Sequence, residues 1–374
     1  MGSSQPARDE VEPDRPGRKV AIRVAKWSIA AIVMVGLAMA ARSAIRQWQS
    51  ERLRIGLAIV EIDRQLEQLE KAPDANRLDA NRRRQLEIQR RSLTASLPRL
   101  GNLRWDRIAL ALFLYAIALV PPAMLLRSAL QSLDQRVSRS TAIAAQLIGH
   151  AGKYVPGKAM VIVLRATALA SDGVTAVPAT VSIFLETFLM MAVGASVAAL
   201  VMVWLPVPTW MAVASIGVAL LACLPTLPPI LRQIAKRVTK MDGLDARSRI
   251  NWRLFAAGWG WSLLSWLLVG ASFTALIAAM PGPNPLPPAP QLYAIATAAI
   301  CLAVVAGFAS LIPGGAGVRE LVLTTILGVS IGPVQGILAA IAARVAYIAV
   351  ESAMAGASWI YLRHRRRRQV SVPR

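Results

Sequence analysis

Long runs of apolar residues alternate along the chain with short clusters of basic residues. Each run approaches the roughly 20 residues that a helix needs to cross the hydrocarbon core of a bilayer. The pattern predicts a first membrane span at 27–45 and a membrane domain over 105–362. Within that domain we expect full spans at 107–126, 178–205, 209–231, 254–280, 292–312 and 334–362.

Two stretches of the membrane domain interrupt this pattern with proline and glycine. Tyr154–Ala159 and Leu311–Ala316 share one order: Pro-Gly, a variable position, then alanine. Such residues suit a continuous helix poorly, and irregular backbone at membrane depth is tolerated only where protein buries it or it lines a wet cavity. The backbone breaks are Pro156, Gly157, Pro313, Gly314, Gly315 and Gly317. We therefore predict two re-entrant or broken helical hairpins, one in each of two pseudo-repeats.

The polar stretch 46–104 has a helical pattern of its own. Isoleucine and leucine recur at spacings of four and three over residues 55–69, which is typical of a coiled-coil seam. Pro73, Asp74 and Asn76 then indicate a turn. We predict an extramembrane antiparallel coiled-coil hairpin, and favour a soluble insertion that stiffens a loop over a docking arm or homodimer contact. The expected fold class is all-α, a polytopic membrane helical bundle of about six full spans with these hairpins.

Basic residues flank the apolar runs, which is the positive-inside pattern. The basic loop 232–253 is therefore expected in the cytoplasm, together with a disordered basic tail at 1–26 and a basic tail at 363–374. The uncharged, proline-rich loop 281–291 and the coiled-coil hairpin would then lie outside. We expect a multi-pass protein of the cell (inner) membrane with both termini in the cytoplasm.

Composition narrows the range of functions. The chain is 55% hydrophobic with a net charge of +22, which indicates an integral membrane protein whose basic residues face lipid headgroups and not nucleic acid. Two cysteines and two histidines supply no disulfide framework, metal-ligand spacing or catalytic triad. No carboxylate pair has a spacing that identifies acid–base catalysis. We expect no metal, no cofactor and no enzymatic activity, although a transferase acting on a lipid carrier would need similar charges.

Several charged residues fall at membrane depth, where a charge at the centre of a spanning helix costs about 2.5–3.5 kcal/mol. They are Lys153, Lys158, Arg165, Glu186, Arg319, Glu320, Arg344 and Glu351. Cations exceed acids, and helix ends beside the Pro-Gly breaks present free N–H groups to a phosphate. This favours anion binding by these residues. The alternative is internal pairing, for example of Glu186 with Arg165, that holds the hairpins against the spans.

The broken segments also carry a family resemblance. Gly152–Leu169, Ser182–Phe188 and Leu311–Leu321 resemble the lysylphosphatidylglycerol synthase transmembrane-region family, often described as flippase-like, and the likeness covers roughly residues 105–362. Family members commonly have Arg or Gly followed by Gly-Glu in the first motif, where this chain has Gly157, Lys158 and Ala159. The resemblance implies lipid handling or translocation. Because no soluble aminoacyl-transfer domain follows the last span, it argues against lysyl-lipid synthesis.

These observations predict a membrane lipid translocator, or a component of one. Its ligand would be an anionic phospholipid or a polyprenyl-phosphate-type lipid, with the headgroup in a midplane cavity between the two broken hairpins. We expect Arg319, Lys158 and Arg165 to line that cavity, with Glu186 or Glu320 close enough to pair. If the two breaks lie on opposite sides of the bilayer, their glycines would instead serve to let helices pack closely. The rival function is a non-transporting scaffold or accessory subunit for envelope-lipid or glycolipid synthesis.

Overall fold

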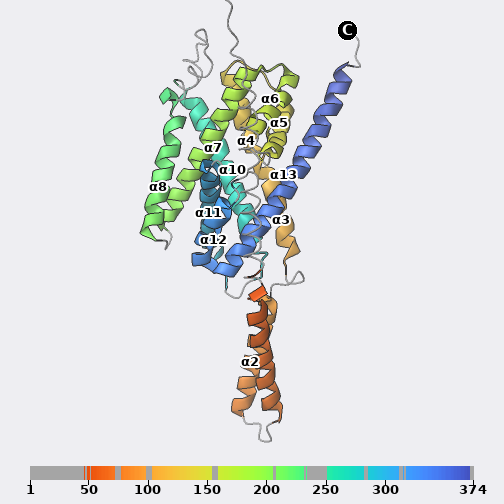
Figure 1. Ribbon diagram of the computed structural model, residues 1–374, viewed down its shortest axis with the longest axis vertical. Coiled ribbons are helices and arrows are strands. Elements are labelled where there is room, and N and C mark those ends of the chain that lie inside the picture. Colours follow the sequence, from red (N-terminus) through yellow and green to blue (C-terminus); the bar gives the residue numbers. More distant parts are fainter. Residues whose placement is uncertain are drawn as a thin grey trace, which may run out of the picture.

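All regular elements of the described chain are helices, which confirms the predicted all-α class (Figure 1). The computed structural model describes residues 46–370, apart from 47–48, 51, 72–76, 98–102, 154–158, 205–207, 231–232, 234–250, 282–284, 311–314 and 316. The predicted first span and N-terminal tail lie outside the described residues, as do most of the basic loop and the end of the C-terminal tail.

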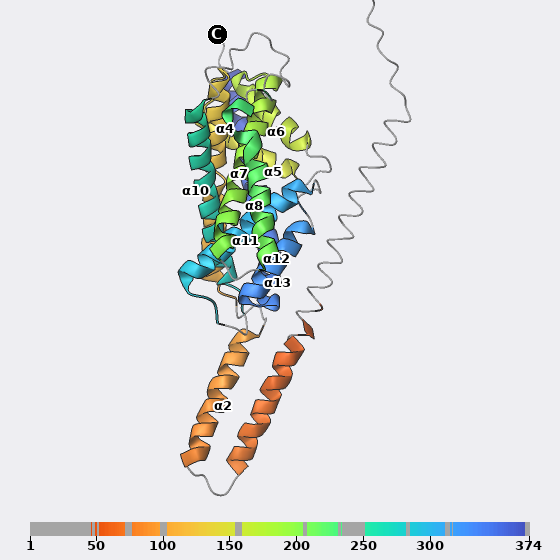
Figure 2. The ribbon, with the colours of Figure 1, turned by 90° about the vertical axis from the view of Figure 1, so that its left-hand side faces the viewer.

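Two helices project together from one end of a larger bundle (Figure 2). The first covers residues 52–71, and the second, α2, spans Arg77–Ser96. Ile55 and Ile62 of the first helix are buried, as is Leu86 of α2, and an ion pair of 2.6 Å joins Arg90 to Asp63. The stretch 46–104 thus contains a helical hairpin outside the main bundle.

Five helices of the described chain are long and apolar enough to cross a membrane, in agreement with a polytopic bundle. The first, Trp105–Ser132, is broken into α3 (Trp105–Ala118) and α4 (Pro121–Ser132). Two consecutive prolines start α4 and cannot donate to the preceding turn. The other four are α7 (Ala176–Trp204), α10 (Trp252–Ile277), α11 (Ala289–Ala309) and the stretch Gln335–Arg365 within α13 (Pro333–Val370).

One predicted span is interrupted. The span predicted at 209–231 contains α8 (Thr209–Cys223), which passes into a 3₁₀ turn, η3, at Leu224–Thr226. Pro225 lies inside that turn and two further prolines follow at 228–229. Since each proline lacks an amide hydrogen, the α-helical ladder is interrupted at 224–227 and resumes at 228–230.

Each Pro-Gly break separates two helices that pack against each other. The first break lies between α5 (Arg139–Gly152) and α6 (Ala159–Leu169), and the second between α11 and α12 (Val318–Ile331). Gly315 and Gly317 have φ values of +64° and +82°, in the left-handed region that favours glycine. Gly317 then caps α12, and its amide donates to the Glu320 carboxylate at 2.7 Å.

α11 is the most buried of the five candidate spans and packs against α7, α10 and α12. Small side chains line it, with Ala296, Ala299 and Ala303 fully buried. Small residues let helix backbones approach closely in membrane bundles. α13 crosses the bundle obliquely (Figure 1) and packs along both α5 and α12, so it contacts a helix from each broken segment.

Candidate functional site

A cavity of about 330 Å³ lies inside the bundle, and both broken segments contribute to its wall. We call it the central cavity. One part of its lining is polar and the other is apolar. Its polar residues include Tyr115, Gln146, His150, Lys153, Arg165, Glu186, Arg319 and Tyr347. Its apolar residues include Phe184, Phe188, Met190, Met191, Val304 and Phe308.

The first polar group centres on a buried ion pair. Arg165 of α6 donates through Nη1 to Glu186 of α7 at 2.7 Å, and Gln146 of α5 donates to the other carboxylate oxygen at 3.2 Å. Arg165 and Glu186 are both buried. Gly149 of α5 makes room for the arginine, because a Cβ at that position would lie 2.3 Å from its Nε. The internal pair named as the alternative at the sequence level is therefore present.

The second polar group centres on Glu351 of α13, whose side chain is 1% exposed. Its carboxylate accepts hydrogen bonds from the Tyr115 hydroxyl and the Lys153 ammonium group. His150 approaches the same oxygen with Nδ1 at 3.9 Å. The rings of Tyr115 and Tyr347 stack with centroids 3.8 Å apart. Elements distant in sequence thus converge on a single buried carboxylate.

Arg319 has a different environment, because no carboxylate of the described chain forms an ion pair with it. It projects from the first turn of α12. Its aliphatic stem passes over Gly307 of α11, where a Cβ would lie 2.6 Å from Cγ, and over Gly315. A cation at a helix N-terminus is not stabilised by the helix dipole. Arg319 is therefore positioned by close packing, with its charge available to the central cavity.

Glu320 and Arg344 pair with each other at 3.4 Å, away from the main lining of the cavity. They line a small adjoining hollow together with Glu351, and Arg319 lines both spaces. Although Arg344 and Glu351 share a face of α13, they bind different helices. The structure thus brings Lys153, Arg165, Glu186 and Arg319 to one cavity and places Glu320, Arg344 and Glu351 beside it. Pro156, Gly157, Lys158, Pro313 and Gly314 lie outside the described residues.

Sequence reasoning missed several polar residues of this site. Gln146, His150 and Lys153 follow one another at spacings of four and three on α5, so they share one helix face. That spacing was a usable signal, because it adds two polar residues to a lysine already singled out. Tyr115 gave no comparable signal, since an isolated tyrosine in an apolar span also suits a membrane interface.

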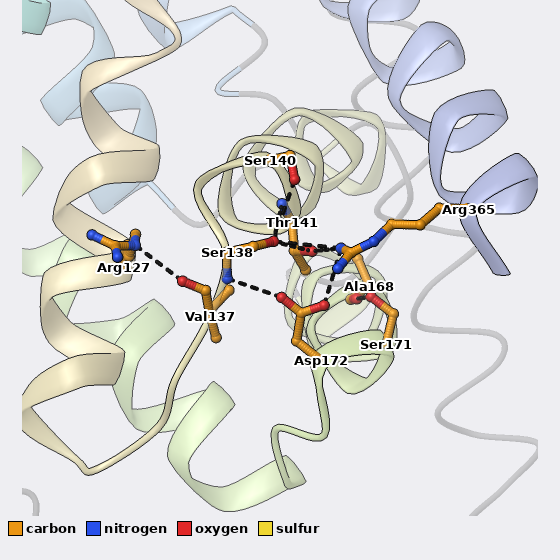
Figure 3. Close-up of polar contacts among 9 residues, drawn as sticks. All are labelled: Arg127, Val137, Ser138, Ser140, Thr141, Ala168, Ser171, Asp172 and Arg365. Carbon is orange, nitrogen blue, oxygen red and sulfur yellow. Dashed lines mark hydrogen bonds and ion pairs between the residues drawn. The ribbon is translucent and has the colours of Figure 1, made fainter. Parts of the chain in front are cut away.

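A separate polar cluster joins the end of α13 to the start of α5 (Figure 3). Arg365 donates to Asp172 at 3.1 Å and also to Thr141, and Asp172 accepts from the backbone amide of Ser138 at 2.9 Å. Burial by itself raises the pKa of the Asp172 carboxyl. The hydrogen bonds from Ser138 and Thr141 and the charge of Arg365 outweigh it, so the pKa lies below the usual value.

Comparison with known proteins gives one family match. A family model described as the lysylphosphatidylglycerol synthase TM region matches residues 88–355. The matched range runs from within α2 into α13 and includes both broken segments and every described charged residue of the central cavity. No curated protein matches the chain.

Proposed function

Since the chain belongs to the family of lysylphosphatidylglycerol synthase transmembrane regions, we propose that it translocates a membrane lipid. The lipid's anionic, phosphate-bearing headgroup binds in the central cavity. The family match supports a role in membrane lipid handling. The proposal that the ligand is anionic rests on the basic residues of the central cavity.

One observation carries the proposal: Lys153, Arg165 and Arg319 line a single cavity within an apolar bundle. Glu186 neutralises Arg165 and Glu351 neutralises Lys153, whereas Arg319 has no ion-pair partner among the described carboxylates. A cation surrounded by hydrocarbon is unfavourable without a counter-charge. A phosphate group supplies that charge, and the planar guanidinium fork of arginine binds two of its oxygens.

The apolar part of the lining supports a lipid over a free anion. Phe184 and Phe188 stack on α7 with ring centroids 6.2 Å apart, and both line the cavity. The Phe184 side chain is also exposed. An amphiphile suits such a lining, because its headgroup can occupy the polar part while its chains pass the phenylalanines toward the hydrocarbon core. The ligand class is an anionic phospholipid or a polyprenyl-phosphate-type lipid.

We propose transport and not covalent catalysis. The buried side chains of the cavity already bind one another: Glu186 with Arg165, and Glu351 with Tyr115 and Lys153. Such pairing suits a charge-balanced binding site, whereas a general base must hold a lone pair toward substrate. We place the protein in the cell (inner) membrane with both termini in the cytoplasm.

Reconstitution into vesicles tests the proposal. Purified full-length protein is incorporated with a phospholipid carrying a fluorescent label on its anionic headgroup, and an impermeant quencher reports movement between leaflets. We expect wild-type protein to move the labelled lipid faster than empty vesicles do. Arg319→Gln is expected to reduce that rate at least about tenfold, the effect of losing one charged hydrogen bond. Arg253→Gln, an exposed position at the start of α10, is the matched control.

A rate equal to that of empty vesicles would overturn the translocator. The scaffold alternative would then gain, and the exposed face of the projecting hairpin favours it. Leu53, Leu57 and Val60 are exposed at spacings of four and three, on one face of the helix 52–71. If wild-type vesicles show no lipid movement and deletion of 46–104 abolishes capture of a membrane-protein partner, the chain is a scaffold.

A further inference from the structure

We propose that Glu351 is a proton-binding site linked to lipid binding: an anionic headgroup binds at Lys153 together with one proton, which Glu351 takes up. This proposal rests on the proposed function. It adds that the pH of the compartment to which the cavity is open affects how tightly the lipid binds. The proton comes from water and attaches to a carboxylate oxygen of Glu351, and no covalent bond to the lipid forms.

The different exposures of the Lys153 and Glu351 side chains support this linkage. The Lys153 side chain is 26% exposed and lines the central cavity, whereas Glu351 is 1% exposed and lies behind it in the adjoining hollow. An anion that enters the cavity therefore meets the lysine before the glutamate. The phosphate and the Glu351 carboxylate then compete for the same ammonium group.

When the phosphate takes the lysine, the Glu351 carboxylate loses its contact with that ammonium group. Among the described residues, α3 presents Tyr115, the C-terminal end of α5 presents His150 and Lys153, and α10 presents the hydroxyl of Ser272, which contacts Tyr347. The hollow beside the carboxylate also holds Arg319, Glu320, Arg344 and Tyr347. Arg344 is paired with Glu320, and Arg319 faces the cavity that the phosphate occupies.

Withdrawing a paired cation from a buried carboxylate is strongly disfavoured, and a second anion nearby raises the cost further. Uptake of one proton removes both penalties. The neutral acid keeps its hydrogen bond with Tyr115, while Lys153 and Arg319 are left to bind the phosphate. Glu186 differs, because its partner Arg165 is buried as well and Gln146 supplies a second donor.

The linkage is tested by binding measurements on the full-length protein. Phosphatidylglycerol in nanodiscs is titrated at about pH 5.5 and about pH 8, a range in which its phosphodiester stays ionised and free carboxylates are charged. We expect wild-type affinity to rise as pH falls, by up to about tenfold per pH unit. Calorimetry in two buffers of different ionisation enthalpy should show net uptake of protons on binding.

Variants assign the proton. Glu351→Gln should bind tightly at both pH values with little proton uptake, whereas Asp106→Asn, which changes an exposed carboxylate outside the cavity, should keep the wild-type pH dependence. Should Glu351→Gln fail to fold, proton uptake by wild-type protein decides whether the linkage exists, and Tyr115→Phe, which removes one partner of the carboxylate, should shift its pH midpoint.

Three results would overturn the proposal. Wild-type binding without pH dependence or proton uptake means that Lys153 serves both anions at once, and it leaves lipid binding intact. A pH dependence that survives in Glu351→Gln but disappears in His150→Gln assigns the proton to the histidine. Absence of phosphatidylglycerol binding at either pH removes this proposal together with the proposed function.

Discussion

Arg165 and Arg319 occupy comparable settings at the scale of single residues. Each follows a Pro-Gly break, and each lies against a glycine of the helix before that break. Arg165 passes over Gly149 of α5, and Arg319 passes over Gly307 of α11. The two glycines fix where the guanidinium groups lie, because any larger side chain would occupy the space of the arginine stem.

Gly149→Ala tests this role directly. The added Cβ would lie 2.3 Å from Nε of Arg165, and the arginine cannot swing away without breaking its ion pair with Glu186. We expect a loss of about 1–3 kcal/mol, as for other overpacked cores. Thermal unfolding of the detergent-solubilised protein measures it. Gly260→Ala in α10, where a Cβ meets nothing within 4 Å, should not lower the midpoint, because alanine favours a helix over glycine, and equal losses in both variants would contradict the assignment.

Arg319 should contribute to lipid affinity more than to folding. Arg319→Ala leaves no described carboxylate without its ion-pair partner, so the protein should fold. Binding of an anionic lipid is expected to weaken by about 1.5–3 kcal/mol, the value of a charged hydrogen bond. Arg319→Lys should restore only part of it, because lysine lacks the planar fork. Titration with anionic and zwitterionic lipids measures the effect, and equal losses for both lipids would argue against a phosphate contact.

At the scale of helices, contacts with α13 are found at both ends of α5. Glu351 binds Lys153 just after the C-terminus of α5, and Arg365 binds Thr141 in its first turn. These two contacts set the register between the helices. Through Glu320 and Arg344, α13 is also joined to α12. One helix therefore connects the two broken segments, and its displacement would alter the cavity from both sides.

Asp172→Asn should loosen the outer end of this connection. It removes the carboxylate that pairs with Arg365 (Figure 3), and a partly exposed charged pair is worth on the order of 1 kcal/mol. We expect trypsin to cleave within 363–368 more rapidly, while cleavage of wild-type protein stays slow. Asp106→Asn is the control, because Asp106 belongs to an exposed ion-pair cluster at the far end of α3.

The pH dependence of this contact follows from the lowered pKa of Asp172. A carboxyl with a depressed folded-state pKa stabilises the protein fully above the pKa of an unfolded aspartate, about 3.9, and loses that contribution as pH falls through the folded value. The stability difference between wild-type protein and Asp172→Asn should therefore be constant near neutral pH and shrink below about pH 4. A difference that grows on acidification would contradict this account.

At the scale of the whole molecule, the projecting hairpin and the C-terminal end of α13 lie at opposite ends of the bundle (Figure 1). The connection between α10 and α11 lies at the hairpin end, because the amide of Arg104, which precedes α3, donates to the Ala279 carbonyl at 3.1 Å. If the basic C-terminal end faces the cytoplasm, the hairpin and this connection must face the other compartment.

Cysteine labelling in intact cells checks this orientation. In a background without Cys223 and Cys301, a cysteine at position 285 should react with an impermeant maleimide, whereas one at position 240 should react only after permeabilisation. The basic residues of 232–253 predict this outcome through the positive-inside rule. Labelling of position 240 in intact cells would reverse the whole arrangement.

The sequence by itself determined the class of fold. A bilayer offers no hydrogen-bonding partners to the backbone, so long uncharged runs must form helices, and they do in α7, α10, α11 and α13. Proline and glycine likewise marked where helices end, since their effect on the backbone is local. The sequence also indicated which charged residues have a role inside the bundle, because each charge is costly at membrane depth.

Only the tertiary structure decided which of those charges meet. Lys153 and Glu351 are 198 positions apart, and Tyr115 and Glu351 are 236, so no local pattern connects them. Glu320, considered as a partner for the cavity arginines, pairs with Arg344, while Glu186 holds Arg165. Partner choice depends on the rotation and depth of whole helices. Those are set by small-residue packing along α11 and by the glycines beneath the two arginines, whose consequences appear only when the helices are assembled.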